Sequence, residues 1–541
     1  MMKSFLPIRR FLVIALILLL GMHHEAFAQT GAAPVHGLGE TFLQGLKWGF
    51  FAVIQPCLYA MFPVTVTFFL KRSQSRAQGI RNAIIYSLSI VTIFTVFAFF
   101  LTLIFGSDTL YQISTSAPFN IFVFVLFMIF GISFLGAFEI TLPSSWTNKV
   151  DSKASANSIS GIFFMALTLV LVSFSCTAAF IGNLLVDVTQ QKARMGPVVG
   201  FLGFSIAIAL PFALFAFFPG MLNKIAKSGG WLNTLKVSFG FIEIAMALKF
   251  LSNVDLAYHW RILDREVYLS LWIIIAGLLG FYLLGKIKFS HDDHLPVNDY
   301  GHPYLTVTRL FFAILALAFT VYMIPGLWGA PLNAISGWLP ENKTQDFNLE
   351  KLIRNIQLTN SDSGSDASGT HTIVVTPKKY TDILSSEISG VQTFFDFDEA
   401  VAAAKIMHKP IMIDFTGHSC ANCRKMEAEV LSTPQVSRKL HDDFVVASLY
   451  VDEKKELPDN EKYTSKFDQS YIDNVGAKNL DFEAVIANSN AQPLYIFTDE
   501  TGKIIQNAGG YNPDKQRFLD ILTKVAAVNS QRFPSSAAVI K

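Results

Sequence analysis

The stretch from Ile411 to Leu431, IMIDFTGHSCANCRKMEAEVL, decides the fold of the C-terminal part of the chain. Its first five residues, IMIDF, predict a short buried strand. The residues that follow, CANCRKMEAEVL, predict a helix that ends near Ser432. A strand that passes into a helix at two cysteines indicates an α/β domain built around a pair of thiols.

The sequence on either side continues this α/β pattern. FDFDEAVAAAKIMHKP predicts a helix that begins at an acidic turn and ends before Pro410. FVVASLYVD and PLYIFTDETGKIIQNAGG predict three more strands, the last two joined by a turn that contains glycine. PDKQRFLDILTKVAAV predicts an amphipathic terminal helix with Pro513 in its first turn. We therefore expect a small α/β domain over residues 391–541.

Cys420 and Cys423 stand at the start of the predicted helix. Residues three apart share one helix face, so the two sulfurs can close a small disulfide ring. The helix N-terminus, with Arg424 and Lys425 nearby, stabilises a thiolate on Cys420. We expect Cys420 to be the nucleophile and Cys423 the resolving thiol. The alternatives are an inert disulfide or half of a metal site, but zinc would need further Cys or His ligands and this domain has no other cysteine.

Two other residues of the domain fit thiol chemistry. Asp414 lies in the predicted strand, where a buried carboxylate can take the proton of the resolving thiol. The alternative for Asp414 is a carboxylate that is satisfied at the strand end. Pro493 precedes a strand in NAQPLYIF, and a cis proline there would press its backbone against the disulfide and accept a substrate strand.

The composition of the whole chain indicates a membrane protein. Of 541 residues, 52% are hydrophobic and 50 are phenylalanine, which is more apolar than soluble proteins of this length. A formal net charge of +2 argues against a nucleic-acid partner. Four cysteines are too few for a disulfide scaffold and are more typical of working thiols.

The N-terminus predicts a signal peptide over residues 1–28, with an Ala-x-Ala cleavage site that ends at Ala28. An uncleaved first span is the alternative. Residues 29–45 would form a short extracytoplasmic segment, followed by a membrane domain over 46–329. This domain holds eight apolar stretches of spanning length, at residues 46–70, 83–105, 118–140, 160–186, 198–220, 237–254, 267–285 and 309–329.

The orientation follows from the charges between the predicted spans. Most of the loop lysines and arginines lie in loops that face the cytoplasm if the first span starts outside. Eight spans then return the C-terminus to the outside. Residues 330–390 contain NSDSGSDASGTH and little apolar periodicity, so they predict a partly flexible extracytoplasmic linker.

The other two cysteines, Cys57 and Cys176, lie near the middle of the first and fourth predicted spans. A single cysteine in a span is most often a small apolar filler. Here they are the only cysteines in the spans, and Pro56 and Pro63 flank Cys57. Spans 1–3 and 4–6 could form inverted repeats that each contribute one cysteine. Because unwound backbone at mid-depth needs a cavity or a protein environment, we expect a functional pair.

Two weaker candidates lie outside these motifs. Glu243 in FGFIEIAMALKF is an intramembrane carboxylate, either functional or in a structural pair with Lys249. His291–His294, HDDH, could hold a metal, but its mixed charge is more typical of a solvated loop, and we expect no metal there.

These motifs resemble those of the DsbD-type thiol:disulfide interchange proteins, which join a CcdA-like membrane electron conduit to a thioredoxin-like domain. PCLYAMFPVTVTFFLKR is similar to the proline-flanked cysteine of the family's first span. SFSCTAAFIGNLLV is similar to its fourth-span cysteine, and DFTGHSCANCRKME to its thioredoxin active site.

The resemblance implies a relay of thiol–disulfide exchanges. Cytoplasmic thioredoxin, supplied ultimately by NADPH, would reduce a Cys57–Cys176 disulfide, which would then reduce Cys420–Cys423. It implies a protein-disulfide reductase with no bound cofactor, in the bacterial inner membrane, with both termini in the periplasm. Periplasmic thiol–disulfide proteins would be the acceptors, with cytochrome c maturation factors, disulfide isomerases and peroxide-reducing proteins all open.

The chain departs from the family pattern at three points. Full-length members carry an N-terminal extracytoplasmic domain with its own cysteine pair. Only about fifteen residues separate Ala28 from the first predicted span, so electrons are expected to leave from Cys420 to separate proteins. Ser419 stands where tryptophan is usual, and Ala178-Ala179 where prolines are common.

Two other functions fit parts of the pattern. A transporter of another solute or metal ion with a tethered thioredoxin-like chaperone domain would need more intramembrane carboxylates or histidines than Glu243. An oxidase that runs the relay in reverse would need a quinone or flavin site, and no G-x-G-x-x-G fingerprint follows a predicted strand. The direction of transfer stays open on the sequence.

Overall fold

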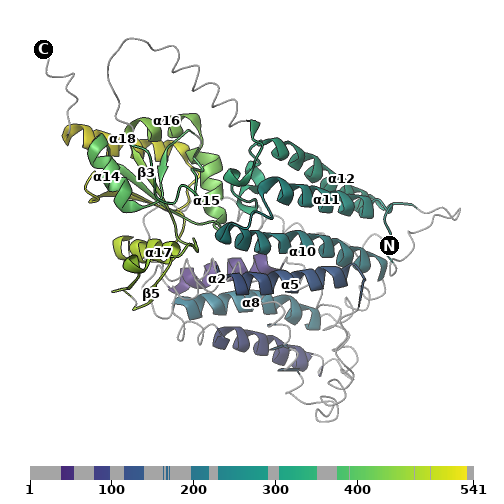
Figure 1. Ribbon diagram of the computed structural model, residues 1–541. Coiled ribbons are helices and arrows are strands. Elements are labelled where there is room, and N and C mark those ends of the chain that lie inside the picture. The colour runs from purple at the N-terminus through teal and green to yellow at the C-terminus, as the bar shows by residue number, and fades with distance from the viewer. Residues whose placement is uncertain are drawn as a thin grey trace. The chain divides into compact units, whose positions relative to one another are not determined.

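The computed structural model (Figure 1) divides into two compact units between Leu327 and Trp328. It describes residues 38–53, 78, 80–97, 115–138, 162–163, 166–167, 170, 196–217, 229–289, 304–349, 375–388, 390–467, 469–487 and 489–532. The predictions for the signal peptide, Cys57, Cys176 and His291–His294 lie outside the described residues.

The first unit is built of apolar helices. Its described helices are α2 (Leu38–Val53), Ile80–Phe97, α5 (Ala117–Phe134), α8 (Gly196–Phe217), α10 (Gly229–Tyr258), α11 (Arg265–Leu283) and α12 (Val307–Met323). Five segments are long and apolar enough to cross a membrane: Ile80–Phe97, Ala117–Phe134, Asn233–Tyr258, Arg265–Leu283 and Val307–Trp328. The unit is therefore a multi-pass membrane domain, while the count of eight spans and the inverted repeat stay predictions.

Glycines let two pairs of these helices approach closely. A Cβ atom at Gly45 of α2 would overlap the carbonyl group of Gly200 in α8, and one at Gly203 would overlap the carbonyl of Phe42. In the same way, a Cβ at Gly131 of α5 would press on Ile244 of α10. Lipid provides no hydrophobic driving force between helices. Close van der Waals packing at small residues stabilises such crossings instead.

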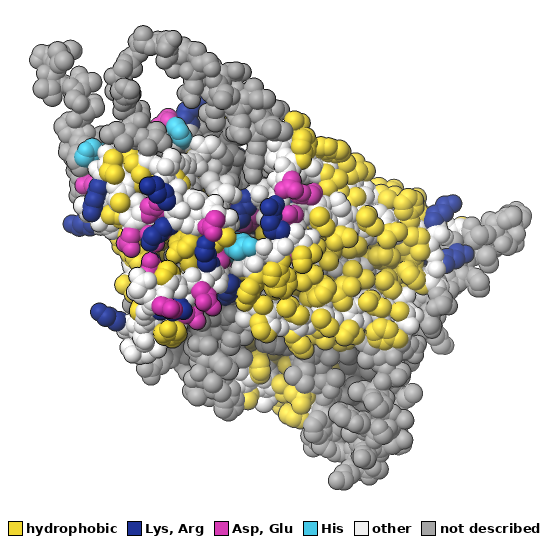
Figure 2. Space-filling view, viewed as in Figure 1, with side chains coloured by type: hydrophobic (Ala, Val, Ile, Leu, Met, Phe, Trp, Pro, Cys, Tyr) yellow, Lys and Arg dark blue, Asp and Glu magenta, His cyan; other side chains and the backbone are white. Residues whose placement is uncertain are grey.

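The outer surface of this unit is apolar. Figure 2 shows a broad, nearly uncharged hydrophobic face over its helices. On α12 the side chains of Phe311, Phe312, Leu315 and Val321 are all more than half exposed. An apolar surface of this extent is far larger than soluble monomers expose, and it fits contact with lipid acyl chains.

The second unit contains a five-stranded mixed sheet in the order β1–β3–β2–β6–β7. Strand β3 pairs in parallel with β1 and β2, whereas β6 is antiparallel to both β2 and β7. The strands are β1 (Thr393–Phe394), β2 (Ile411–Thr416), β3 (Val445–Tyr450), β6 (Leu494–Thr498) and β7 (Ile504–Gly509), with a separate hairpin of β4 (Tyr463–Thr464) and β5 (Tyr471–Ile472).

Helices surround this sheet, as Figure 1 shows. They are α14 (Phe397–Met407), α15 (Ala421–Met426), a π-helical turn η4 (Glu427–Leu431), α16 (Pro434–Asp443), α17 (Val475–Ala487) and α18 (Lys515–Arg532), with a short 3₁₀ turn η5 (Asp459–Glu461). The strands and helices predicted from the sequence of this domain are all present. Helices α16 and α17, strand β1 and the β4–β5 hairpin were not predicted from the sequence.

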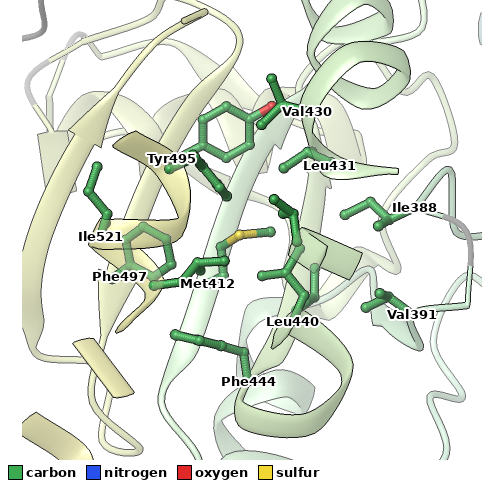
Figure 3. Close-up of a cluster of buried hydrophobic side chains, with 14 of the residues drawn as sticks. Ile388, Val391, Met412, Val430, Leu431, Leu440, Phe444, Tyr495, Phe497 and Ile521 are labelled. Atoms are coloured by element: carbon green, nitrogen blue, oxygen red, sulfur yellow. The ribbon is translucent and has the colours of Figure 1, made fainter. Parts of the chain in front are cut away.

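A dense apolar core holds the second unit together (Figure 3). Met412 of β2, Phe497 of β6, Leu440 of α16 and Leu522 of α18 are fully buried in one cluster. Burying side chains of this size contributes roughly 1.5–3 kcal/mol each. The core therefore fixes β2, and with it the loop that leads to Cys420.

Two pieces of the predicted linker, residues 330–349 and 375–388, are folded with this unit. The first contains two short 3₁₀ turns, η2 (Asn333–Trp338) and η3 (Asn342–Thr344), with the fully buried Leu339 between them, and a further turn, η1 (Ile324–Trp328), precedes it. Turn η2 packs on α15, where a Cβ at Gly337 would lie 3.0 Å from the carbonyl oxygen of Ala421. Such turns have no helical or strand period, which explains why the sequence pattern did not reveal them.

Candidate active site

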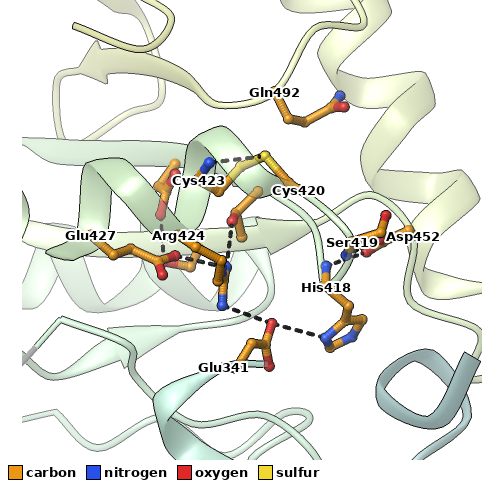
Figure 4. The surroundings of a disulfide bond; sticks show 12 residues. Glu341, His418, Ser419, Cys420, Cys423, Arg424, Glu427, Asp452 and Gln492 are labelled. Carbon is orange, nitrogen blue, oxygen red and sulfur yellow. Dashed lines mark hydrogen bonds and ion pairs between the residues drawn. A yellow bond between two sulfur atoms is a disulfide. The ribbon is translucent and has the colours of Figure 1, made fainter. Parts of the chain in front are cut away.

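The two C-terminal cysteines form a disulfide at the N-terminus of α15 (Figure 4). Their Cα atoms lie 5.3 Å apart. Cys420 is the N-cap residue of the helix, and its sulfur accepts a hydrogen bond from the backbone N–H of Cys423 at 3.1 Å. After reduction, the same N–H and the positive end of the helix dipole would stabilise a thiolate on Cys420.

The two sulfurs differ in access. Cys420 is half-buried, whereas Cys423 is only 1% exposed. An incoming protein disulfide can therefore reach Cys420 first. The buried Cys423 is placed to attack the mixed disulfide that Cys420 then forms. This arrangement fits the predicted nucleophile and resolving thiol.

Asp414 is buried in β2, the strand that leads into the disulfide loop. Its Oδ2 accepts a hydrogen bond from Ser448 at 3.2 Å, and its Oδ1 has no hydrogen-bond partner in the described part of the chain. Burial raises the pKa of Asp414 to about 7, despite opposing effects of Ser448 and Arg424. A carboxyl that titrates near neutral pH is suited to exchanging protons with a thiol.

Replacing Asp414 by asparagine is expected to stabilise the second unit at pH 8 but not near pH 4. The carboxyl titrates near its ordinary value of 3.8 when unfolded and near 7 when folded, so the folded unit binds more protons between these values. Its stability therefore falls as pH rises through that window. Asp414→Asn should raise the free energy of unfolding at pH 8 by up to roughly 4 kcal/mol. Scanning calorimetry of the oxidised full chain at both pH values measures this.

The control for this measurement is Asp442→Asn, because the side chain of Asp442 is exposed. That variant should show no comparable pH-dependent gain. A gain for Asp414→Asn that is the same at both pH values would contradict the assignment of the titration to Asp414.

The peptide bond between Gln492 and Pro493 is cis. It precedes β6, which pairs with the strand of Asp414. Gln492 donates a hydrogen bond from Nε2 to Glu483 at 2.6 Å and is among the surroundings of the disulfide in Figure 4. Pro493 therefore has the backbone geometry that the sequence suggested for it.

The loop before Cys420 is held by one carboxylate. Asp452 accepts hydrogen bonds from the backbone N–H groups of His418 (2.8 Å) and Ser419 (3.0 Å), and from the Ser419 hydroxyl (2.7 Å). Ser419, where the resemblance led us to expect tryptophan, thus forms two hydrogen bonds with Asp452. The short Ser419 side chain fixes the loop by its hydroxyl hydrogen bond and does not cover the loop.

A buried group of charged side chains lies beneath this loop. It comprises Glu341, Lys343, His418, Arg424, Glu427 and Glu453. This group was not predicted from the sequence. His418 and Glu427 lie within the stretch that decided the fold, but nothing in the sequence pattern links them to Glu341, about eighty residues earlier.

Glu243 and Lys249 are both buried side chains of α10. Oε2 of Glu243 has no hydrogen-bond partner among the residues that the structure describes. The burial of Glu243 fits both roles named above for it, a functional carboxylate and a structural pair with Lys249.

Both parts of the chain match known protein families. Residues 39–254 match the cytochrome c biogenesis protein transmembrane domain, and residues 397–526 match the thioredoxin-like domain. The first matched segment contains helices α5 and α8 and most of α2 and α10, but not α11 or α12, and the second contains the Cys420–Cys423 site.

Among curated proteins, the chain is similar to thiol:disulfide interchange proteins named DsbD. The protein of Vibrio vulnificus is 23% identical over 396 residues, which is 71% of this chain and 54% of that protein. The protein of Haemophilus influenzae is 24% identical over 340 residues, 62% of this chain and 47% of that protein. The protein of Ralstonia nicotianae is 22% identical over 411 residues, which is 75% of this chain and 59% of that protein. The chain thus spans about half the length of these relatives.

Proposed function

We propose that this chain, a DsbD-type protein that joins a multi-pass membrane domain to a thioredoxin-like domain, transfers reducing equivalents across the bacterial inner membrane. In this proposal it is a protein-disulfide reductase. The observation that carries the proposal is the Cys420–Cys423 disulfide at a helix N-terminus, in a chain whose other half matches a cytochrome c biogenesis membrane domain.

The first exchange takes place in the membrane domain. A thiolate of reduced cytoplasmic thioredoxin attacks the disulfide between Cys57 and Cys176 and forms a mixed disulfide. The second thioredoxin thiol then breaks that bond, which leaves thioredoxin oxidised and both membrane cysteines as thiols. Two electrons and two protons have moved, and no bound cofactor is needed.

The second exchange passes the same two electrons to the outer site. The membrane dithiol attacks the half-buried sulfur of Cys420, and the resulting mixed disulfide is resolved by the other membrane cysteine. The membrane pair is oxidised again, and Cys420 and Cys423 become thiols.

The outer dithiol then reduces a protein disulfide in the periplasm. The thiolate of Cys420 attacks, and Cys423 resolves the mixed disulfide from its buried position. Asp414 accepts the proton that Cys423 loses, which its pKa of about 7 permits. The substrate leaves with two thiols, and the Cys420–Cys423 disulfide is restored.

The orientation and the acceptors belong to the same proposal. We place both termini in the periplasm because lysines and arginines concentrate in the loops that then face the cytoplasm. The match to a cytochrome c biogenesis domain favours acceptors that serve cytochrome c maturation.

Removing cytoplasmic thioredoxin tests the proposed donor. In cells that lack it, Cys420 and Cys423 should change from mostly dithiol to mostly disulfide, because no other step of the relay supplies electrons. Acid quenching followed by alkylation and gel shift measures the two forms. Restoring thioredoxin on a plasmid is the control, and an outer pair that stays reduced without thioredoxin would exclude it as the donor.

A further inference from the structure

One carboxylate lies at the centre of the buried charges under the disulfide loop. Glu341 is fully buried and contacts three cationic groups: His418 Nδ1 at 3.0 Å, Arg424 NH1 at 3.0 Å and Lys343 Nζ at 2.7 Å. Figure 4 shows Glu341 between His418 and Arg424. A buried carboxylate with three such partners is strongly held, and its removal would leave buried charge uncompensated.

Two of these partners flank the reactive cysteine along the chain. His418 lies in the loop just before Cys420, and Arg424 lies in α15 just after Cys423. Arg424 also donates to Glu427 at 2.8 Å and to Thr416 of β2 at 3.3 Å. Glu341 therefore connects the two sides of the C-x-x-C turn through one side chain.

The charges around His418 explain why it stays cationic. Its Nε2 contacts Glu453 at 3.0 Å, opposite Glu341, and its ring lies against that of Tyr450. Burial alone would lower the pKa of His418, but Glu341 and Glu453 raise it to about 9. For Glu427 burial has the opposite effect: it raises the pKa well above its usual value, in spite of Arg424. Burial opposes ionisation of Glu341, but the charges of Lys343, His418 and Arg424 hold its pKa well below the usual range, so this carboxylate is negatively charged.

The segment that carries Glu341 is anchored independently. The backbone N–H groups of Asn342 and Lys343 donate to the carboxylate of Glu387 at 3.0 and 3.1 Å. Turn η2 rests on the first turn of α15 through Gly337 and Ala421. This segment follows α12 directly in sequence, so the chain that leaves the last described apolar helix becomes part of the outer site.

We propose that Glu341 is a positioning residue of the thiol–disulfide site: through His418 and Arg424 it fixes the turn around Cys420 and sets the balance of charge that the Cys420 thiolate experiences. The inference rests on the proposed thiol–disulfide function of Cys420 and Cys423. It adds a residue outside the matched thioredoxin-like region, residues 397–526, to that site.

Two substitutions that change the charge of the group in opposite directions test this role. Glu341→Gln keeps the shape but removes a negative charge, while Glu453 still contacts His418 and favours its protonated form. The thiolate is therefore favoured, and the pH midpoint of Cys420 alkylation should fall. Lys343→Met removes a positive charge from the same carboxylate, so the midpoint should rise. Below the midpoint, the alkylation rate should change by roughly threefold or more, upward for Glu341→Gln and downward for Lys343→Met.

The measurement uses the full chain in detergent, with Cys57→Ala and Cys176→Ala so that only the outer thiols react. After reduction, the rate of iodoacetamide alkylation of Cys420 is followed by peptide mass spectrometry across pH. Glu399→Gln is the control, because Glu399 accepts hydrogen bonds from two backbone N–H groups of this unit but lies outside the charged group. Its curve should overlay that of the unchanged chain.

Shifts of opposite sign support the proposal. Loosening of the fold would move both variants in the same direction, and that result, or overlaid curves, would overturn it. If Glu341→Gln does not fold, Lys343→Met decides alone, since an unshifted curve for that variant contradicts the charge balance. The assay needs no transfer across the membrane, so failure of the relay and failure of this inference are distinguishable.

Discussion

Cys423→Ala is expected to trap the protein in mixed disulfides with its acceptors, whereas Cys420→Ala should form none. Cys420 is the half-buried N-cap sulfur that a substrate can reach, and Cys423 is 1% exposed beneath it. Without Cys423, the mixed disulfide loses its intramolecular attacker, whose effective concentration can exceed about 10⁵ M. Non-reducing gels of cells quenched with acid should show high-mass adducts that collapse on reduction.

The double variant, Cys420→Ala with Cys423→Ala, is the control and should show no adducts. Adducts on Cys420→Ala but not on Cys423→Ala would mean that the roles of the two thiols are reversed. Mass spectrometry of the trapped species would also identify the acceptors, which neither the fold nor the site geometry names.

Cys57→Ala and Cys176→Ala are each expected to leave the Cys420–Cys423 pair oxidised in growing cells. A single remaining membrane thiol can form a mixed disulfide with thioredoxin but cannot pass on two electrons and return to its starting state. The fraction of dithiol at the outer pair should fall from most of the protein to little of it. Alkylation of the outer pair and mass shift on a gel measure this fraction.

An alanine variant at a nearby span residue, such as Val64→Ala, controls for general damage to the membrane domain and should keep the outer pair reduced. If the outer pair stays reduced in both cysteine variants, electrons reach it by another route. The membrane domain would then need another function, such as transport of a solute.

The fold of the thioredoxin-like domain could be predicted from a short sequence. Ile411–Leu431 contains a continuous apolar strand, a break, and two cysteines at a helix start, and the structure has β2, a loop and α15 in those places. The location of Cys420 and Cys423 at the start of this helix could be predicted from the change of pattern from strand to helix. Asp414 could be named as a candidate because a carboxylate in an apolar strand must either find a partner or change its pKa.

The rest of the site could not be found in this way. Glu341 lies in a region of 3₁₀ turns that has no apolar period, and its partners are far along the chain. Helix α16 has a strongly polar sequence that buries only Val436, Ser437 and Leu440. Such contacts depend on tertiary packing, which overrides the local pattern.

In the membrane domain, hydropathy predicted the apolar helices, but not how they meet. The close contacts of Gly45 with Gly200, and of Gly131 with Ile244, depend on which small residues face each other. The ends of the helices were also hard to predict, because hydropathy changes gradually there. For example, α10 runs from Gly229 to Tyr258, beyond the predicted span 237–254 on both sides.

Transfer across a sealed bilayer tests the central claim most directly. The full-length protein would be reconstituted into lipid vesicles with reduced thioredoxin inside and an impermeant protein disulfide outside. We predict that the outer disulfide is reduced by vesicles with the unchanged chain, but not by vesicles with Cys57→Ala or Cys420→Ala. Equal reduction by the Cys57→Ala vesicles, or none by the unchanged chain, would contradict a relay through the membrane cysteines.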